Sequence, residues 1–224
     1  MKFYFINFKI NKMDHKQQIF FIEGNIGSGK STFLTRIPEF IDDCQVILGP
    51  LNIWQNLTDS DGTNILEHFY TDMNKHAYAF QSFAFLSRTK SLETIDKTKK
   101  YIFIERSTYS DKNIFARNCF MTGIMPEIHY NLYNEWFSWM ENFLKVENTQ
   151  HVYLRCDPKI SFERQKKRNR GEESGLNLEY MTQIHDRHEE WLMKDTNTIV
   201  LDASNSFNVN NNDMNEILSK LNLQ

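Results

Sequence analysis

The segment FFIEGNIGSGKST, residues 20–32, decides the fold of this chain. It fits the phosphate-binding pattern G-x-x-x-x-G-K-[ST], directly after an apolar strand-like run and directly before a helical pattern. Glycines let backbone N–H groups turn inward around phosphate oxygens, and the helix N-terminus adds a partial positive charge. We therefore expect a loop for a nucleoside triphosphate, with Lys30 at the β- and γ-phosphates and Ser31 on Mg²⁺. The predicted nucleotide-binding residues are Gly24, Asn25, Ile26, Gly27, Ser28, Gly29, Lys30, Ser31 and Thr32.

Working outward, short apolar runs alternate with longer helical patterns along the chain. The runs are continuous rather than alternating, as in strands buried on both faces of a parallel sheet. The alternation predicts an α/β fold of three layers, with one P-loop domain over residues 19–224 after an N-terminal extension, 1–18. The expected strands are 19–23, 46–48, 101–105, 151–154 and 198–202, and the expected helices are 30–37, 65–92 and 114–145 (each in two pieces), 158–167 and 178–193.

The composition is that of one large domain and gives no reason to expect a long nucleic-acid or membrane surface. Of the 224 residues, 40% are hydrophobic, which is enough for a sizeable core. The net charge of −3 gives no reason to expect nucleic-acid binding, and no apolar run approaches the ~20 residues of a membrane helix. Three scattered cysteines argue against a disulfide framework or a zinc site and favour a reducing compartment, the cytoplasm.

A second motif, YIFIERSTYSD (residues 101–111), places an acid and a base at the end of a predicted strand. In a parallel α/β sheet, ligands bind at the carboxyl ends of the strands. We expect Glu105 to bind Mg²⁺, directly or through water, and Arg106 to clamp a phosphate. A plain surface ion pair is the alternative.

A third motif, FERQKKRNRGEESGLNLEYM (residues 162–181), is rich in arginine. Arg164 and Arg168 stand four residues apart on one helical face, and Arg170 follows in a turn. Guanidinium groups suit bidentate phosphate contacts, so this segment is a candidate lid that neutralises charge on a transferred phosphoryl group. The alternative is a solvated basic face at the negative end of a helix.

Together, IEGNIGSGKST, IERSTYSDKNIFA and RNRGEES resemble the deoxyribonucleoside kinases of the deoxycytidine and deoxyguanosine kinase branch. The segments PLNIWQN, FQSFAFLSR and YNEWFSWM match in the same order, so the resemblance runs from about residue 19 to 192. It implies a five-stranded parallel sheet with helices on both sides, a homodimer, and transfer of phosphate from ATP with Mg²⁺ to the 5′-hydroxyl of a deoxyribonucleoside.

The resemblance also assigns roles by position. Phosphate and Mg²⁺ would be bound by Lys30, Ser31, Glu105 and Arg106. The lid would be formed by Arg164, Arg168 and Arg170. The resemblance implies that Tyr70 and Glu173 bind the 3′-hydroxyl of the deoxyribose. It also implies that Trp54 and Phe115 flank the faces of the base. The edge of the base would be bound by Gln81, with Arg88 and Asp111 nearby. That last pair implies preference for deoxycytidine or deoxypurine nucleosides over thymidine, whose 5-methyl group it would crowd; a purely structural ion pair is the alternative.

Gln81 is also suggested by physical chemistry, because it is a polar residue in the apolar helical segment AYAFQSFAFLSR. An amide donates and accepts hydrogen bonds at once, as the edge of a base requires. A glutamine on the helix surface is the alternative.

The segment 128–144 carries two apolar stripes at helical spacing. One stripe is enough for a core, so the second favours a homodimer over a helix buried in a monomer. The first stripe is Ile128, Leu132, Trp136, Trp139 and Phe143, and the second is Tyr130, Tyr133, Phe137, Met140 and Leu144.

One position departs from the family pattern. In VILGPLNIW (residues 46–54), Gly49 stands where the family has a glutamate that takes the proton from the 5′-hydroxyl. Upstream acids should be carried away by the strand, and Glu23 is a poor substitute. A nucleoside kinase relying on positioning, Mg²⁺ and arginines ranks first. The alternatives are a kinase for deoxynucleoside monophosphates, whose phosphate needs no base and which Arg106 would hold, and a catalytically weak nucleotide-binding protein.

Overall fold

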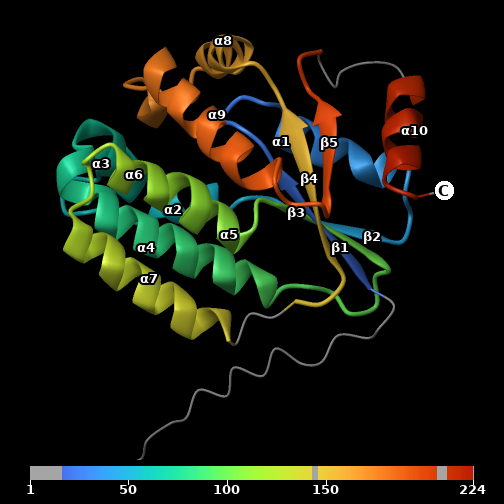
Figure 1. Cartoon of the computed structure of the whole chain (residues 1–224), viewed down its shortest axis with the longest axis horizontal. Helices are drawn as coiled ribbons and strands as arrows, with labels where there is room; N and C mark the ends of the chain where they lie inside the picture. Colours follow the sequence, from blue (N-terminus) through green and yellow to red (C-terminus); the bar gives the residue numbers. More distant parts are fainter. Residues whose placement is uncertain (1–16, 143–145, 206–210, 224) are drawn as a thin grey trace, which may run out of the picture.

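The computed structural model describes residues 17–142, 146–205 and 211–223, and its centre is a five-stranded parallel sheet (Figure 1). The strand order is β2-β3-β1-β4-β5, and every pair of neighbouring strands is parallel. This confirms the predicted α/β fold. The strands are β1 (Gln18–Glu23), β2 (Cys44–Ile47), β3 (Tyr101–Glu105), β4 (Thr149–Arg155) and β5 (Thr198–Asp202).

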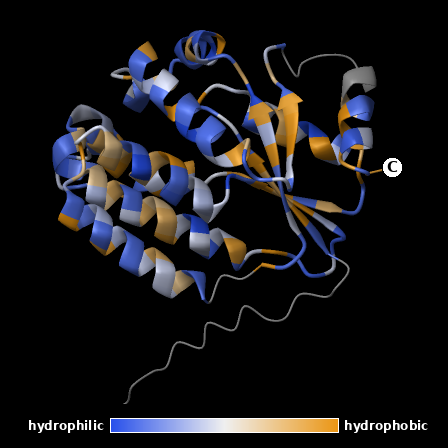
Figure 2. Cartoon of the chain, viewed as in Figure 1, coloured by the Kyte–Doolittle hydropathy of each residue, from blue (hydrophilic) through white to orange (hydrophobic). Residues whose placement is uncertain are grey.

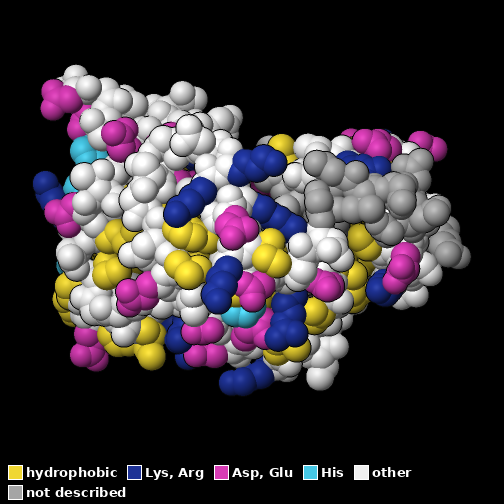
Figure 3. Space-filling view, turned by 90° about the horizontal axis from the view of Figure 1, so that it is seen from above, with side chains coloured by type: hydrophobic (Ala, Val, Ile, Leu, Met, Phe, Trp, Pro, Cys, Tyr) yellow, Lys and Arg dark blue, Asp and Glu magenta, His cyan; other side chains and the backbone are white. Residues whose placement is uncertain are grey.

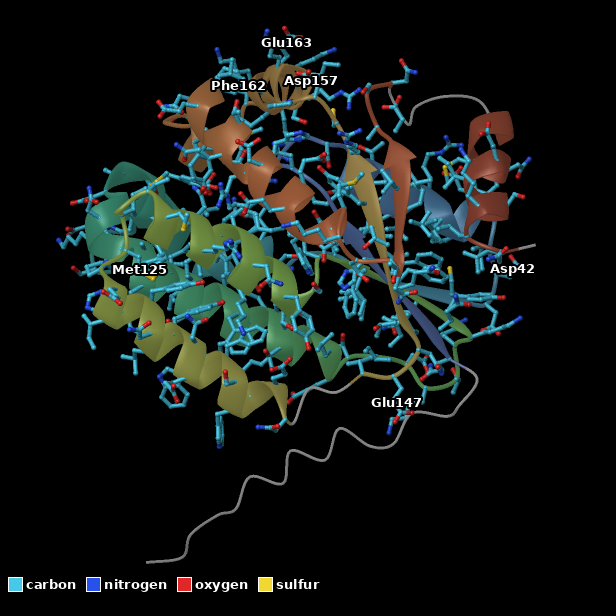
Figure 4. All side chains as sticks on the ribbon, in the orientation of Figure 1. Asp42, Met125, Glu147, Asp157, Phe162 and Glu163 are labelled. Atoms are coloured by element: carbon cyan, nitrogen blue, oxygen red, sulfur yellow. The ribbon has the colours of Figure 1, made fainter. Side chains whose placement is uncertain are left out.

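Helices connect the strands. They are α1 (Lys30–Arg36), α2 (Leu51–Asn56), α3 (Ile65–Thr71), α4 (Met73–Leu92), α5 (Thr108–Ser110), α6 (Arg117–Met121), α7 (Glu127–Glu141), α8 (Pro158–Arg168), α9 (Leu178–Leu192) and α10 (Asn211–Lys220). The break in 65–92 lies at Asp72, whose side chain caps α4 by accepting the N–H of Lys75. Asp157 caps α8 in the same way, and Figure 4 shows it where that helix begins.

The sheet is covered on both faces. On one face, side chains of β1, β3, β4 and β5 pack with α1 and α10 in a core that includes Phe20, Phe33 and Leu218. On the other face, Ile19, Phe21 and Ile104 pack with Leu92 at the end of α4. Figure 2 shows the strands as the most hydrophobic part of the drawn chain. Burial on both faces is why the strand sequences are continuously apolar.

Two elements differ from the predicted ones. Helix α2 was not predicted because its six residues make less than two turns, too few for a 3.6-residue period to be recognised, although Leu51 and Trp54 pack against a core cluster. In the segment 108–121 the helix passes through a π-helical turn, Asp111–Ala116, which a period of 3.6 residues does not reveal. Such turns are frequent at functional sites.

Three further predictions concern the N-terminal extension, membrane spans and the cysteines. Residues 1–16 of the predicted N-terminal extension lie outside the described residues, and the boundaries of the domain stay a prediction, although pairing of β1 with β3 already starts at Gln18. Within the described ranges, no helix has the length and apolar character to span a bilayer. The cysteines Cys44, Cys119 and Cys156 are free.

Candidate active site

The phosphate loop joins β1 to α1 and is shaped by its glycines. Gly24 and Gly27 have φ of 141° and 77°, which side-chain-bearing residues rarely adopt. A Cβ on Gly24 would lie 2.7 Å from the carbonyl oxygen of Leu154, and one on Gly27 would collide with the carbonyl oxygen of Ser161. The loop therefore packs directly against the end of β4 and against α8, which requires glycine at both positions.

Lys30 is buried at the start of α1 and points back into the loop. Its ammonium donates to the carbonyl oxygens of Gly24 (3.1 Å) and Asn25 (2.7 Å). Burial, and after it the positive charge of Arg106, hold the pKa of Lys30 well below its usual value. The positive charge of Lys30 thus lies where a bound anion would stabilise it, because a phosphate would offer a full negative charge in place of the carbonyl dipoles.

Glu105 lies at the end of β3, beside Ser31 and Gly49. Both carboxylate oxygens of Glu105 accept from the Ser31 hydroxyl at 3.3 Å, and one accepts from the Gly49 N–H at 3.2 Å. Burial would raise the pKa of Glu105, but Lys30, the Gly49 N–H and two arginines outweigh it and lower that pKa. An ionised carboxylate beside a hydroxyl is a donor set that fits Mg²⁺, which binds few protein oxygens and completes its shell with water and phosphate.

The predicted lid segment comprises α8 and the 3-10 turn Gly171–Glu173. Asn169 ends α8 in the left-handed conformation, with φ of 51°. Arg168 and Arg170 both form ion pairs with Glu173, at 2.6 Å for Arg170. Arg164 instead donates to the carbonyl oxygens of Ala203 and Ser204, both at 2.7 Å. Two lid arginines are therefore gathered at one carboxylate, and the third contacts the segment after β5.

The turn that contains Glu173 is also hydrogen-bonded to α2 and to the residue before α3. Gln55, at the end of α2, donates to the Glu172 carboxylate at 2.7 Å, and Asn64 does so at 3.4 Å. In Figure 1, α8 lies beyond the carboxyl ends of the strands and α9 runs back beside the sheet; Figure 3, which looks onto this end of the molecule, shows Lys and Arg side chains in the middle of the view.

One cavity of about 950 Å³ joins the phosphate loop, the end of β3, helices α2 and α4, and the lid. Gly24, Asn25 and Ser28 do not line it; the Asn25 amide instead donates to the carbonyl oxygen of Met181 at 2.8 Å. The predicted residues that do line it are Ile26, Gly27, Gly29, Lys30, Ser31, Thr32, Trp54, Tyr70, Gln81, Arg88, Glu105, Arg106, Asp111, Phe115, Arg164, Arg168, Arg170 and Glu173.

Gln81 lines the cavity from α4, two turns before Arg88, which contacts the carbonyl oxygen of Glu105. Its side chain is 1% exposed, and its Nε2 has no hydrogen-bond partner among the described residues. A buried donor without an acceptor costs about 1–3 kcal/mol, so such a group is expected where a ligand supplies the partner. Gln81 is not on the helix surface, which excludes that alternative.

A buried ion pair lies in the cavity wall two turns along α4 from Gln81. Arg88 donates through Nε to Asp111 at 2.8 Å and through Nη1 to the carbonyl oxygen of Glu105 at 2.8 Å. Burial would lower the pKa of Arg88, but Asp111 outweighs it and raises that pKa. Trp54, which donates to the Ser87 hydroxyl at 2.8 Å, lies with its ring 5.9 Å from the Arg88 guanidinium.

The acids upstream of Gly49 are far from this cavity. Asp43 accepts hydrogen bonds at the beginning of β3, the opposite end of the sheet, and Figure 4 shows Asp42 there, away from α8. Glu23 is fully buried but bonded to the backbone and hydroxyl of Ser107 (2.9 and 2.8 Å) and to the Ser110 hydroxyl. It holds the loop after β3 in place and does not line the cavity.

Comparison with known proteins identifies the family that has this site. A family model of deoxynucleoside kinases matches residues 20–223. The chain belongs to the deoxynucleoside kinase family. It is 37% identical to the probable deoxycytidine kinase of Fowlpox virus (76% of this chain, 70% of that protein) and 33% identical to human deoxycytidine kinase (78% and 75%). It is also 36% identical to human mitochondrial thymidine kinase 2 (80% and 66%).

These relatives bear on the acceptor. As a member of the deoxynucleoside kinase family, the chain is an enzyme that phosphorylates deoxynucleosides with a nucleoside triphosphate as donor. The alternative of a monophosphate acceptor is not favoured.

Sequence reasoning missed one residue that this deoxynucleoside kinase places against the site. His188 of α9 contacts Arg106, 82 positions away. The available signal was a polar residue on an apolar helical stripe, since His188 follows Met181 and Ile184 at core spacing and all three are buried.

Proposed function

We propose that this kinase transfers the γ-phosphoryl group of ATP, or of another nucleoside triphosphate, to the 5′-hydroxyl of a deoxyribonucleoside with the help of Mg²⁺. Deoxycytidine or a deoxypurine nucleoside is preferred over thymidine. The observation that supports the proposal is one cavity lined both by Lys30 and by Gln81, whose Nε2 has no hydrogen-bond partner among the described residues. It has a phosphate site at one end and a base site at the other.

The residues at the phosphate end position and neutralise the transferred group. Lys30 exchanges its two carbonyl acceptors for the β- and γ-phosphates, and Ser31 and Glu105 would hold Mg²⁺. Mg²⁺, when bound, offsets the charge that develops on the phosphoryl group. Arg106 and the lid arginines add donors to the same oxygens.

The residues at the other end orient the nucleoside. Trp54 and Phe115 flank the base, and Gln81 bonds its edge with both the donor and the acceptor of its amide. Tyr70 and Glu173 bind the 3′-hydroxyl. The carboxylate of Glu173 accepts a hydrogen bond from this hydroxyl in addition to those from its two arginines. This orientation aims the 5′-hydroxyl at the phosphate loop.

The ion pair of Arg88 and Asp111 supports the base preference. Both residues are buried, at 3% and 2% exposed, and they line the same cavity as Gln81. A polar pair offers the 5-methyl group of thymidine no apolar contact, while it can bond the exocyclic groups of other bases.

An acceptor panel tests the proposal. The protein is incubated with ATP·Mg²⁺ and each deoxynucleoside or deoxynucleoside monophosphate at equal concentration, and ADP is measured. We expect turnover with deoxycytidine or deoxypurine nucleosides, less with thymidine, and little with monophosphates. Strong preference for thymidine would contradict the base assignment, and absence of turnover with every acceptor would contradict catalysis.

We also propose a homodimer formed through α7, in the cytoplasm. The second stripe is turned inward, since Tyr133, Phe137 and Met140 are buried, whereas the first is exposed on Ile128 (71%), Leu132, Trp136 (55%) and Trp139. Phe143 and Leu144 lie outside the described residues. A second copy would cover this face.

Sedimentation of the wild-type protein and of Trp136→Glu tests the dimer. We expect a dimer for the first and a monomer for the second, because a carboxylate at the centre of an apolar interface is desolvated without a partner. Glu135→Gln, a change at the neighbouring position, is the control. A wild-type monomer at micromolar concentration would refute the proposal.

A further inference from the structure

The environment of Arg106 is unusual for a buried charge. The side chain is 7% exposed and lines the cavity, and its guanidinium lies 4.8 Å from the centre of the Phe115 ring. Buried arginines are usually paired with a carboxylate. Among the described residues, however, the hydrogen-bond partner of the Arg106 side chain is the Nε2 atom of His188, at 3.3 Å from Nη1.

The protonation of His188 follows from its two partners. A guanidinium only donates hydrogen bonds, so Nε2 must be without a proton to accept from Arg106. The other ring nitrogen, Nδ1, lies 2.7 Å from the carbonyl oxygen of Ile184, which only accepts, so Nδ1 must carry the proton. The ring is therefore neutral and in a single tautomer.

The surroundings of the ring favour the same state. His188 is fully buried, and the Tyr153 ring stacks on it at 5.6 Å with an interplanar angle of 4°. Burial, and then the charge of Arg106, lower the pKa of His188 to about 3. The charged groups that act on it from other elements are Glu23 of β1 and Lys30 of α1, which oppose one another. Tyr153 is itself fixed, because its hydroxyl donates to Glu189 at 2.8 Å.

A neutral acceptor has a consequence that a carboxylate would not have. A carboxylate partner would cancel much of the positive charge of Arg106 and compete with phosphate for its donors. A neutral imidazole takes one N–H of the guanidinium and fixes the direction of the group without adding negative charge, while Glu23, Glu105 and Asp111 act on Arg106 only through space. The remaining donors are then available to an anion in the cavity.

We propose that His188 is a positioning residue for phosphoryl transfer: its Nε2 holds the guanidinium of Arg106 toward the cavity without neutralising it. The inference rests on the proposed phosphate role of Arg106. His188 lies behind the arginine, does not line the cavity, and acts on the reaction only through Arg106.

Substitutions at His188 test this role in kinetics. His188→Phe keeps a ring to stack on Tyr153 but removes the acceptor, and we expect kcat to fall by roughly 10–100-fold, the cost of misplacing a catalytic group by about 1 Å. The KM for deoxynucleoside should change little. His188→Gln restores an acceptor and should recover most of the loss. His185→Phe, on the adjacent turn of α9, is the matched control and should leave activity unchanged.

A double variant distinguishes positioning from a general structural effect. In an Arg106→Ala background, His188→Phe should cause no further loss, because the interaction that it disrupts is already absent. A loss that persists in that background would overturn the proposal. Equal activity of the wild-type enzyme and of the His188→Phe and His188→Gln variants would also overturn it, with all three shown to be folded by thermal unfolding.

Imidazole ¹⁵N spectra of the wild-type enzyme give a test that does not depend on the His188 variants folding. We expect the proton of His188 on Nδ1 from pH 6 to 8, and a shift of the Nε2 resonance in Arg106→Ala. A proton on Nε2, or titration of the ring within that range, would overturn the proposal. Activity of the same sample on deoxynucleosides separately tests the proposed function, so failure of one is distinguishable from failure of the other.

Discussion

At the phosphate end of the cavity Lys30 and Ser31 already have partners within the chain, whereas at the base end the buried Nε2 of Gln81 has none among the described residues. Lys30 donates to two carbonyl oxygens, and Ser31 donates to Glu105, so that end is held together without a ligand. The Nε2 of Gln81 lacks an acceptor among the described residues. The two ends therefore differ in what a ligand contributes to them.

The difference indicates how binding and chemistry are divided. A preorganised phosphate end changes partners when the donor binds and needs little rearrangement as charge develops. An unsatisfied base end gains its hydrogen bond only when the right base is present, so a base that cannot accept is penalised. Changes at the phosphate end should reduce the rate, and changes at the base end should alter selectivity and substrate affinity.

Lys30→Met should produce the largest effect. We expect turnover to fall by on the order of 10³-fold or more, because the charge on the transferred phosphoryl group loses its main cationic partner in the loop. The fold should be retained, because methionine has a similar size and carries no charge. The buried charge of Lys30 is itself unfavourable, since burial lowers the pKa of this residue. Turnover and thermal unfolding are measured together. Near-normal turnover in a folded variant would break the assignment of this end to phosphate.

Gln81→Leu should produce the next largest effect, and a different kind. We expect kcat/KM for the preferred deoxynucleoside to fall by roughly 10–100-fold through KM, since a bonded amide of about 1–3 kcal/mol is lost. Stability should stay the same or rise, because the substitution removes a buried donor that has no partner among the described residues. Discrimination between bases should shrink. A fall in kcat with unchanged KM would contradict the division between the two ends.

The residues of the phosphate end could be predicted from a local motif, whereas most residues of the base end were predicted only from the resemblance to a family. Residues 24–31 are contiguous, and their glycines are required by local backbone geometry, so the motif and its strand and helix are visible in one short segment. The edge acid Glu105 was found in the same way, as the last residue of a strand. These features depend on local sequence.

Other features depend on contacts between distant segments. The partner of Arg106 is 82 positions away, and Arg164 contacts carbonyl oxygens 39 and 40 positions away. No local pattern reports such pairings. The π-helical turn that begins at Asp111 was also missed, because its hydrogen bonds do not follow the 3.6-residue period used to find helices.

Gly49 lies between the two ends, and substitution there should give the smallest effect and the only gain. Its φ is outside the left-handed region, and a Cβ would meet the Glu105 carboxylate at 3.6 Å, an ordinary contact, so the position accepts a side chain. In Gly49→Glu we expect turnover on deoxynucleosides to rise about tenfold, at the low end of what a general base contributes, because the new carboxylate must share the site with Glu105. Gly49→Gln, which has the same size but no basic group, is the matched control and should show no gain.

Mutual repulsion of the two carboxylates should lower the melting temperature of Gly49→Glu relative to Gly49→Gln, and Mg²⁺ should reduce that difference in melting temperature by binding between the carboxylates. If the two variants have equal turnover, this loop is not where the proton of the 5′-hydroxyl is removed, and the reaction depends on the orientation supplied by the two ends of the cavity.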